Sequence, residues 1–144
     1  YNETLRDRVC AVSNKTHYNE MNVLSMHALI GAYQPQGYEW VDELNQVLAG
    51  NIEYFCTYAE KHWKGVAFSR PQGTYMVFLD CTEWCREHGR DIQWLLDEGA
   101  RVGVGYQDGR PFHGLCHIRV NLALPLSRVR EACDRLDRYV FNAR

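Results

Sequence analysis

The stretch TYMVFLD, residues 74–80, decides the fold because it is the clearest strand in the 144-residue sequence. Aromatic and other β-favouring side chains dominate it, which is typical of a mostly buried strand. The turn-forming residues PQG at 71–73 stand directly before it. A second run, CHIRVN at 116–121, alternates in polarity, which indicates a strand with two different faces. Its apolar face would carry Cys116, Ile118 and Val120, and its polar face His117, Arg119 and Asn121.

Apolar residues at steps of three and four predict helices around these strands. The longest helix is predicted over residues 37–63, with the stripe Val41, Leu44, Leu48, Ile52, Phe55 and Ala59. The last begins near Ser127, with the stripe Val129, Ala132, Cys133, Leu136 and Val140. Shorter helices are predicted over 2–12, 20–33, 82–89 and 91–98, short strands over 66–69 and 102–104, and a glycine-rich loop over 105–114.

This order of elements predicts an α+β fold, a two-layer α/β sandwich. A sheet of about four strands would be covered on one face by helices and preceded by an N-terminal helical segment. We expect two parts, a helical segment over residues 1–35 and a small α/β domain over residues 36–144. The first part has little of its own to pack against, so we expect it to belong partly to a neighbouring domain.

Composition excludes several classes of protein. With 46% hydrophobic and 24% charged residues and a formal charge of −2, the chain is globular and lacks the basic field that nucleic-acid binding needs. No apolar run is long enough to cross a membrane, and no signal segment stands at the start. The six cysteines fit no secreted disulfide framework, so we expect reduced thiols and a cytoplasmic location.

Arg119 is the main candidate for a functional residue. It stands in the middle of a predicted strand between two apolar neighbours, where a guanidinium is costly unless it meets a partner. Its planar fork suits a carboxylate held through two hydrogen bonds. The pattern alone leaves three possibilities open: a ligand carboxylate, an internal Asp or Glu, or simple exposure.

Cysteine and histidine suggest two further sites, both of which we disfavour. Cys81, Cys85 and His88 do not form the closely spaced pairs of a zinc knuckle, so we expect no metal site. Cys116 and His117 are adjacent on a strand and point to opposite faces, so they do not form a simple nucleophile–base pair.

Five blocks in order carry a resemblance to a known family. They are residues 24–25 leading to 31–33, 37–44 (GYEWVDEL), 71–80 (PQGTYMVFLD), 102–112 (VGVGYQDGRPF) and 118–125 (IRVNLALP). On these blocks the chain resembles the C-terminal part, or small domain, of pyridoxal-phosphate (PLP)-dependent fold-type I enzymes of the aspartate-aminotransferase fold. Within them it is most similar to the cystathionine β-lyase-like C–S lyases.

The resemblance implies a parent enzyme, a C–S lyase or aminotransferase, with pyridoxal 5'-phosphate as cofactor, an amino acid as substrate and a homodimeric assembly. In the family, an arginine in the strand before the last helix holds the substrate α-carboxylate, and Arg119 in Ile-Arg-Val-Asn matches it. The loop 105–114 would lie near the active-site mouth and move when the small domain closes.

The same resemblance implies that the cofactor-binding residues lie outside this chain. The lysines are Lys15, Lys61 and Lys64, and none has the position of the family's cofactor lysine. We therefore expect no catalytic or cofactor-binding residue here, a missing large domain as partner, and no activity of the chain alone. The alternative is a cofactor-free α+β ligand-binding or interaction module.

Overall fold

The computed structural model describes residues 2–18 and 20–143, and it divides into two compact units. One unit runs up to Asp42 and the other from Glu43 onward, so the division falls inside the long helix α3 (Pro35–His62).

The first unit is helical. It holds α1 (Glu3–Thr16), α2 (Val23–Ala32) and the first turns of α3. Asn2 and Asn22 cap the two short helices, each accepting a hydrogen bond from the backbone N–H three residues on. Ser13 is the buried residue of α1, and α2 has none. The observed helix α1 ends at Thr16, four residues beyond the predicted end at residue 12.

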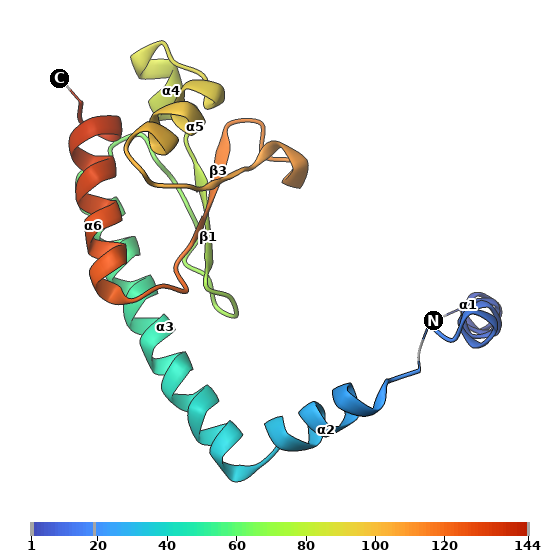
Figure 1. Cartoon of the computed structure of the whole chain (residues 1–144). Coiled ribbons are helices and arrows are strands. Elements are labelled where there is room, and N and C mark those ends of the chain that lie inside the picture. The colour runs from blue at the N-terminus through green and yellow to red at the C-terminus, as the bar shows by residue number, and fades with distance from the viewer. Residues whose placement is uncertain (1, 19, 144) are drawn as a thin grey trace. The chain divides into compact units, whose positions relative to one another are not determined.

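The second unit contains a three-stranded antiparallel sheet in the order β1–β3–β2 (Figure 1). The strands are β1 (Met76–Asp80), β2 (Gln107–Asp108) and β3 (His117–Asn121). The helices are the rest of α3, α4 (Thr82–His88), α5 (Ile92–Arg101) and α6 (Leu126–Leu136). A 3-10 turn, η1 (Arg110–Phe112), precedes β3, and one π-helical turn, η2 (Asp137–Phe141), continues α6.

One core holds this unit together. Val77 and Leu79 of β1 and Ile118 of β3 are fully buried and join a cluster that also contains residues of α3, α4, α5 and α6. In Figure 1, α3 and α6 lie side by side, and Tyr58 of α3 donates a hydrogen bond to Asp134 of α6 at 3.3 Å. Trp63 stacks on Phe141, with ring centroids 4.5 Å apart, which closes the end of this helix pair.

The structure confirms the α+β class and corrects several details. The sheet of the described chain has three strands rather than about four, because the predicted strand 66–69 is reduced to a single bridge between Ala67 and Asp80. The predicted strand 102–104 begins as a turn after α5, and the third strand, β2, lies inside the predicted loop instead. The helix predicted over 91–98 continues to Arg101 as α5, and Gly99 lies within it, where the absence of a Cβ makes room for the Tyr106 ring. Ser127 lies inside α6, whose N-cap position is Pro125.

Candidate functional site

Arg119 lies on the sheet face that does not pack into the core. On β3, Ile118 and Val120 point into the core, so Arg119 between them points the other way and is half-buried. Its cross-strand partners are Phe78 on β1 and Gln107 on β2. The alternation predicted from the sequence is therefore present in the structure.

Two side chains contact the guanidinium of Arg119. Its Nη1 donates a hydrogen bond to the Gln107 Oε1 at 3.2 Å. The ring of Phe112 lies beneath it, with Cζ 4.5 Å from the ring centroid, a distance typical of a cation–π contact. Both groups hold the guanidinium in place, and neither of them cancels its charge.

No acidic residue in the described part of the chain pairs with Arg119, so the internal salt bridge that the sequence left open is not formed. The guanidinium borders a hollow of about 400 Å³. The other lining residues are Thr74, Met76, Phe78 and Phe112. A positive charge with no acidic partner in the described chain thus borders a mostly apolar hollow, and its planar fork has the shape that a carboxylate matches.

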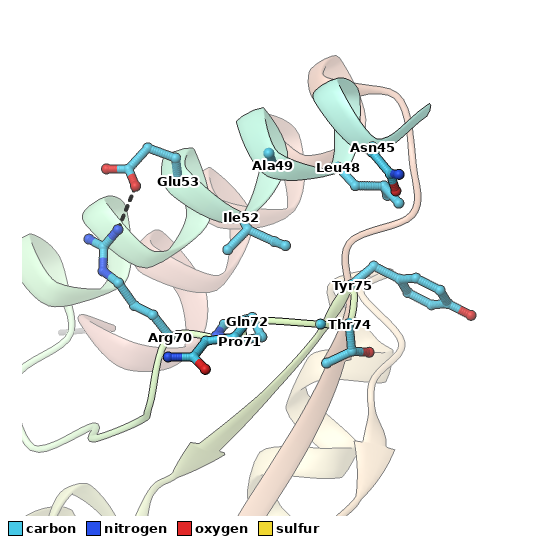
Figure 2. Close-up of a pocket in the computed structure, with 11 residues that line it drawn as sticks. Asn45, Leu48, Ala49, Ile52, Glu53, Arg70, Pro71, Gln72, Thr74 and Tyr75 are labelled. Carbon is cyan, nitrogen blue, oxygen red and sulfur yellow. Dashed lines mark hydrogen bonds and ion pairs between the residues drawn. The ribbon is translucent and has the colours of Figure 1, made fainter. Parts of the chain in front are cut away.

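Arg70 provides a contrast within the same unit. It borders a larger hollow of about 580 Å³ between α3 and the 70–75 segment (Figure 2). Its Nη1 lies 2.6 Å from Glu53 and its Nη2 lies 2.9 Å from Glu60, so two carboxylates already satisfy it. Arg70 therefore anchors the segment before β1 to α3 and is not available to an added anion.

The loop that carries Gln107 and Phe112 is held by an ion pair. The Asp108 carboxylate accepts from the Arg110 backbone N–H at 2.9 Å and from its Nε at 2.7 Å. The hydrogen bonds from Arg110 lower the pKa of Asp108 below its usual value. Gly109 and Gly114 press against His117, where a Cβ on either would come within 2.8 Å of it. These contacts pin the loop to β3, on which Arg119 stands.

Asp80 and His117 form a second polar pair on the same sheet face. The His117 Nε2 lies 3.8 Å from the Asp80 carboxylate, and its ring packs on Phe78 with centroids 4.7 Å apart. Partial burial raises the pKa of Asp80, but hydrogen bonds from Thr82 and the nearby His117 outweigh this, and the net pKa is lowered. Asp80 also accepts from both the hydroxyl and the N–H of Thr82, the first residue of α4, so its carboxylate is held by its own chain neighbours.

The cysteines do not form a reactive site. The pKa values of Cys85 and Cys133 are raised to about 12, mainly by burial, and this disfavours their thiolates. Over residues 2–18 and 20–143, no group of three or more His, Cys, Asp or Glu side chains is arranged to bind a metal ion. His88 stacks on Trp84 and its Nδ1 contacts the Trp84 carbonyl at 2.8 Å, which is a structural role. None of the described helices is both long and apolar enough to span a membrane.

The sequence identified Arg119 but missed the two residues that contact it. Gln107 and Phe112 fall in the segment predicted as a loop, where no periodicity shows which side chain meets the strand. One feature of the sequence points to them: the loop directly precedes β3. A segment so close in sequence can fold back and pair with the edge of that strand.

Two known proteins are similar in sequence to most of this chain. No protein-family model matches the sequence. A protein of Mycobacterium leprae named "Putative cystathionine beta-lyase" is 33% identical over 124 residues, and one of Mycobacterium tuberculosis with the same name is 29% identical over 128 residues. Each match covers 75% of this chain and 30% of the relative.

Solved structures share the fold. The PLP-bound C–S lyase from Staphylococcus hominis superposes with a TM-score of 0.77 and 25% identity, over 94% of this chain and 35% of its own. Cystalysin from Treponema denticola gives 0.70 and 22%, over 82% of this chain and 29% of its own. An aspartate aminotransferase variant from Thermus thermophilus gives 0.75 and 18%, over 90% of this chain and 34% of its own.

These matches confirm the resemblance and the fold class predicted from the sequence. The chain is homologous to the mycobacterial proteins over three quarters of its length, and it spans about a third of the length of the relatives and structures it matches.

Proposed function

We propose that this chain, a homologue of cystathionine β-lyase-like proteins, is the C-terminal part of a PLP-dependent C–S lyase or aminotransferase that acts on amino acids. Within that enzyme, Arg119 binds the α-carboxylate of the substrate. The names of the relatives support the reaction class, and the bound PLP of the Staphylococcus hominis C–S lyase supports the cofactor. The whole enzyme would be a homodimer, with a large domain supplied by the rest of its chain.

One observation carries the role of Arg119. Its guanidinium is half-buried, held by Gln107 and Phe112, and without an acidic partner in the described chain, whereas Arg70 in the same unit is satisfied by two carboxylates. A half-buried guanidinium that is held in place and has no acidic partner is available to an added anion, whereas one already paired with two carboxylates is not. A carboxylate that accepts two parallel hydrogen bonds matches the planar guanidinium in charge and shape.

The residues around Arg119 do not fit the cofactor itself. A Schiff base with pyridoxal phosphate needs a lysine, and the five residues that line the hollow include none. Lys15 and Lys61 lie in the last turns of α1 and α3. We therefore assign the cofactor lysine to the part of the enzyme outside this chain and assign no catalytic step to residues within it.

The contribution of Arg119 is orientation. A carboxylate gripped by a fixed guanidinium loses its freedom to rotate, so the rest of the amino acid is held in one direction relative to the sheet. Movement of the small domain would carry the gripped carboxylate with it.

The test is substitution of Arg119 in the full-length enzyme. Arg119→Ala should weaken amino-acid binding by about 2–4 kcal/mol, or roughly 30- to 1,000-fold, because a charge-assisted double contact is lost. The visible absorbance of the bound cofactor should stay unchanged. Arg86→Ala removes an exposed arginine of α4 and serves as the matched control, with no expected effect on binding. Unchanged substrate affinity in Arg119→Ala would refute the role.

A further experiment separates an enzyme fragment from a cofactor-free module. The 144-residue chain mixed with pyridoxal phosphate should give no stoichiometric Schiff-base band and no turnover. A stoichiometric band that disappears in Lys15→Ala would contradict the assignment of the cofactor lysine to the missing part.

A further inference from the structure

We infer that Gln107 is a positioning residue that sets the orientation of the Arg119 guanidinium for the incoming carboxylate, an inference that rests on the function proposed above. Gln107 is directly opposite Arg119 in the β2–β3 ladder. Its side-chain carbonyl accepts from Arg119 Nη1 at 3.2 Å. β2 is only two residues long, and one of them makes this contact.

The chemistry of the amide explains why glutamine suits this position. An arginine side chain has several rotatable bonds, so an exposed guanidinium samples many directions. A neutral carbonyl oxygen removes part of this freedom without cancelling the charge. A carboxylate at the same place would form an ion pair with Arg119 and compete with the ligand.

Phe112 completes the restraint from a second direction. Its ring lies against the face of the guanidinium, 4.5 Å from Cζ, while Gln107 holds one nitrogen at the edge. One contact limits tilting of the plane and the other limits rotation within it. The remaining N–H groups are left for a ligand, since the guanidinium has five.

The fold of the loop before β3 places both Gln107 and Phe112 against Arg119. Asp108 follows Gln107 directly and binds Arg110, which begins the 3-10 turn that ends at Phe112. Gly109, between them, allows a backbone approach to His117 that a Cβ would block at 2.5 Å. The two contacts on Arg119 therefore come from one folded segment of six residues, Gln107 to Phe112.

The kinetic test is a set of substitutions in the full-length enzyme. Gln107→Leu should raise KM for the amino acid by roughly 3- to 10-fold with little change in kcat, because one hydrogen bond to the charged group is lost. Gln107→Glu should raise KM more than Gln107→Leu does. In an Arg119→Ala background, Gln107→Leu should have no further effect on KM. Gln46→Leu, at an exposed glutamine of α3 in the same unit, is the matched control and should leave KM unchanged.

A second readout needs no activity. In the 144-residue chain, nitrogen-15 NMR of the arginine side chains should show slow rotation about the Cζ–Nε bond of Arg119. Gln107→Leu should speed this rotation by about threefold or more, since the hydrogen bond no longer resists it. The urea midpoint of unfolding should not change, because the Gln107 side chain is exposed.

The outcomes separate the two proposals. If Arg119→Ala leaves substrate affinity unchanged, the function proposed for Arg119 fails. If Arg119→Ala weakens binding but Gln107→Leu changes neither KM nor the rotation rate, only the positioning role fails. An equal effect of Gln107→Leu with and without Arg119 would also overturn it, because the effect would not pass through the arginine.

Discussion

Asn51 offers the sharpest test of how the site is supported. It lies on α3 with 1% of its surface exposed, and its Nδ2 donates to the carbonyls of Leu122 and Leu124 at 2.8 and 2.7 Å. These carbonyls belong to the segment that connects β3, with Arg119, to α6. One buried amide group therefore fastens the end of the Arg119 strand to the longest helix.

The size of the effect follows from what Asn51→Ala removes. Two hydrogen bonds contribute about 1 kcal/mol each, and a buried carbonyl left without a donor costs a further ~1–3 kcal/mol. The variant also removes the buried Asn51 Oδ1, which accepts no hydrogen bond in the described chain, and this returns about 1 kcal/mol. We therefore expect the free energy of unfolding to fall by about 2–4 kcal/mol, a large part of the ~5–15 kcal/mol typical of a domain. Asn51→Asp should be worse at neutral pH, since a carboxylate cannot donate and would be buried against two carbonyl oxygens.

The assay is urea unfolding of the 144-residue chain followed by tryptophan fluorescence. Trp63 and Trp84 are both buried and report on this core. Asn45→Ala is the matched control, because Asn45 is exposed on the same helix, and it should change stability by less than about 0.5 kcal/mol. A fall of less than about 0.5 kcal/mol for Asn51→Ala, or equal falls for the two variants, would refute the reasoning.

Two further predictions concern glycine and acid. Gly99→Ala should lower the urea midpoint although alanine favours helices, because the added Cβ would meet the Tyr106 ring at 2.5 Å. Gly50→Ala, whose added Cβ would meet no atom within 4 Å apart from its chain neighbours and the local helix backbone, should instead raise the free energy of unfolding by about 0.5–1 kcal/mol. A rise in both variants would contradict the contact between residue 99 and Tyr106. The folded-state pKa of Asp108 is lowered, so its stabilisation is present above the usual Asp value of about 3.9 and is lost as pH falls through the folded value. Protection of the 107–114 amides, measured against the intrinsic exchange rate at each pH, should therefore fall below about pH 4 in the wild type and be low at all pH values in Asp108→Asn. Protection that does not change with pH would rule out the Asp108–Arg110 pair as the restraint.

Much of the fold was predictable because periodicity decides it. The α3 and α6 stripes and the two long strands bury their apolar faces as the pattern indicated, and Asp91 caps α5 through the Trp94 N–H at 2.8 Å. Burial of a repeated face is a local property that a sequence shows directly.

The errors lie where a short segment gains its structure from distant contacts. β2 has two residues and forms only because β3 offers a free edge, so no local preference marks it. In the same way, the helix predicted to end at residue 98 runs through Gly99 to Arg101, because the missing Cβ of Gly99 makes room for the Tyr106 ring. Such roles depend on which side chains meet in three dimensions.

The candidate site was predictable in part for the same reason. The position of Arg119 on a polar strand face follows from alternation, and the family resemblance supplied its proposed role. The identity of its contacts, Gln107 and Phe112, depends on how the loop folds back, which the sequence pattern did not show.

The placement of Arg119 between two core residues has an evolutionary consequence. Ile118 and Val120 anchor its Cα to the most stable part of the unit, whereas its terminal atoms take their direction from a surface loop. The core therefore fixes where the Arg119 backbone lies, and the loop fixes the direction of its guanidinium. Substitutions in the loop would therefore change the direction of the guanidinium while the core around Ile118 and Val120 stays intact, so the two properties can evolve independently.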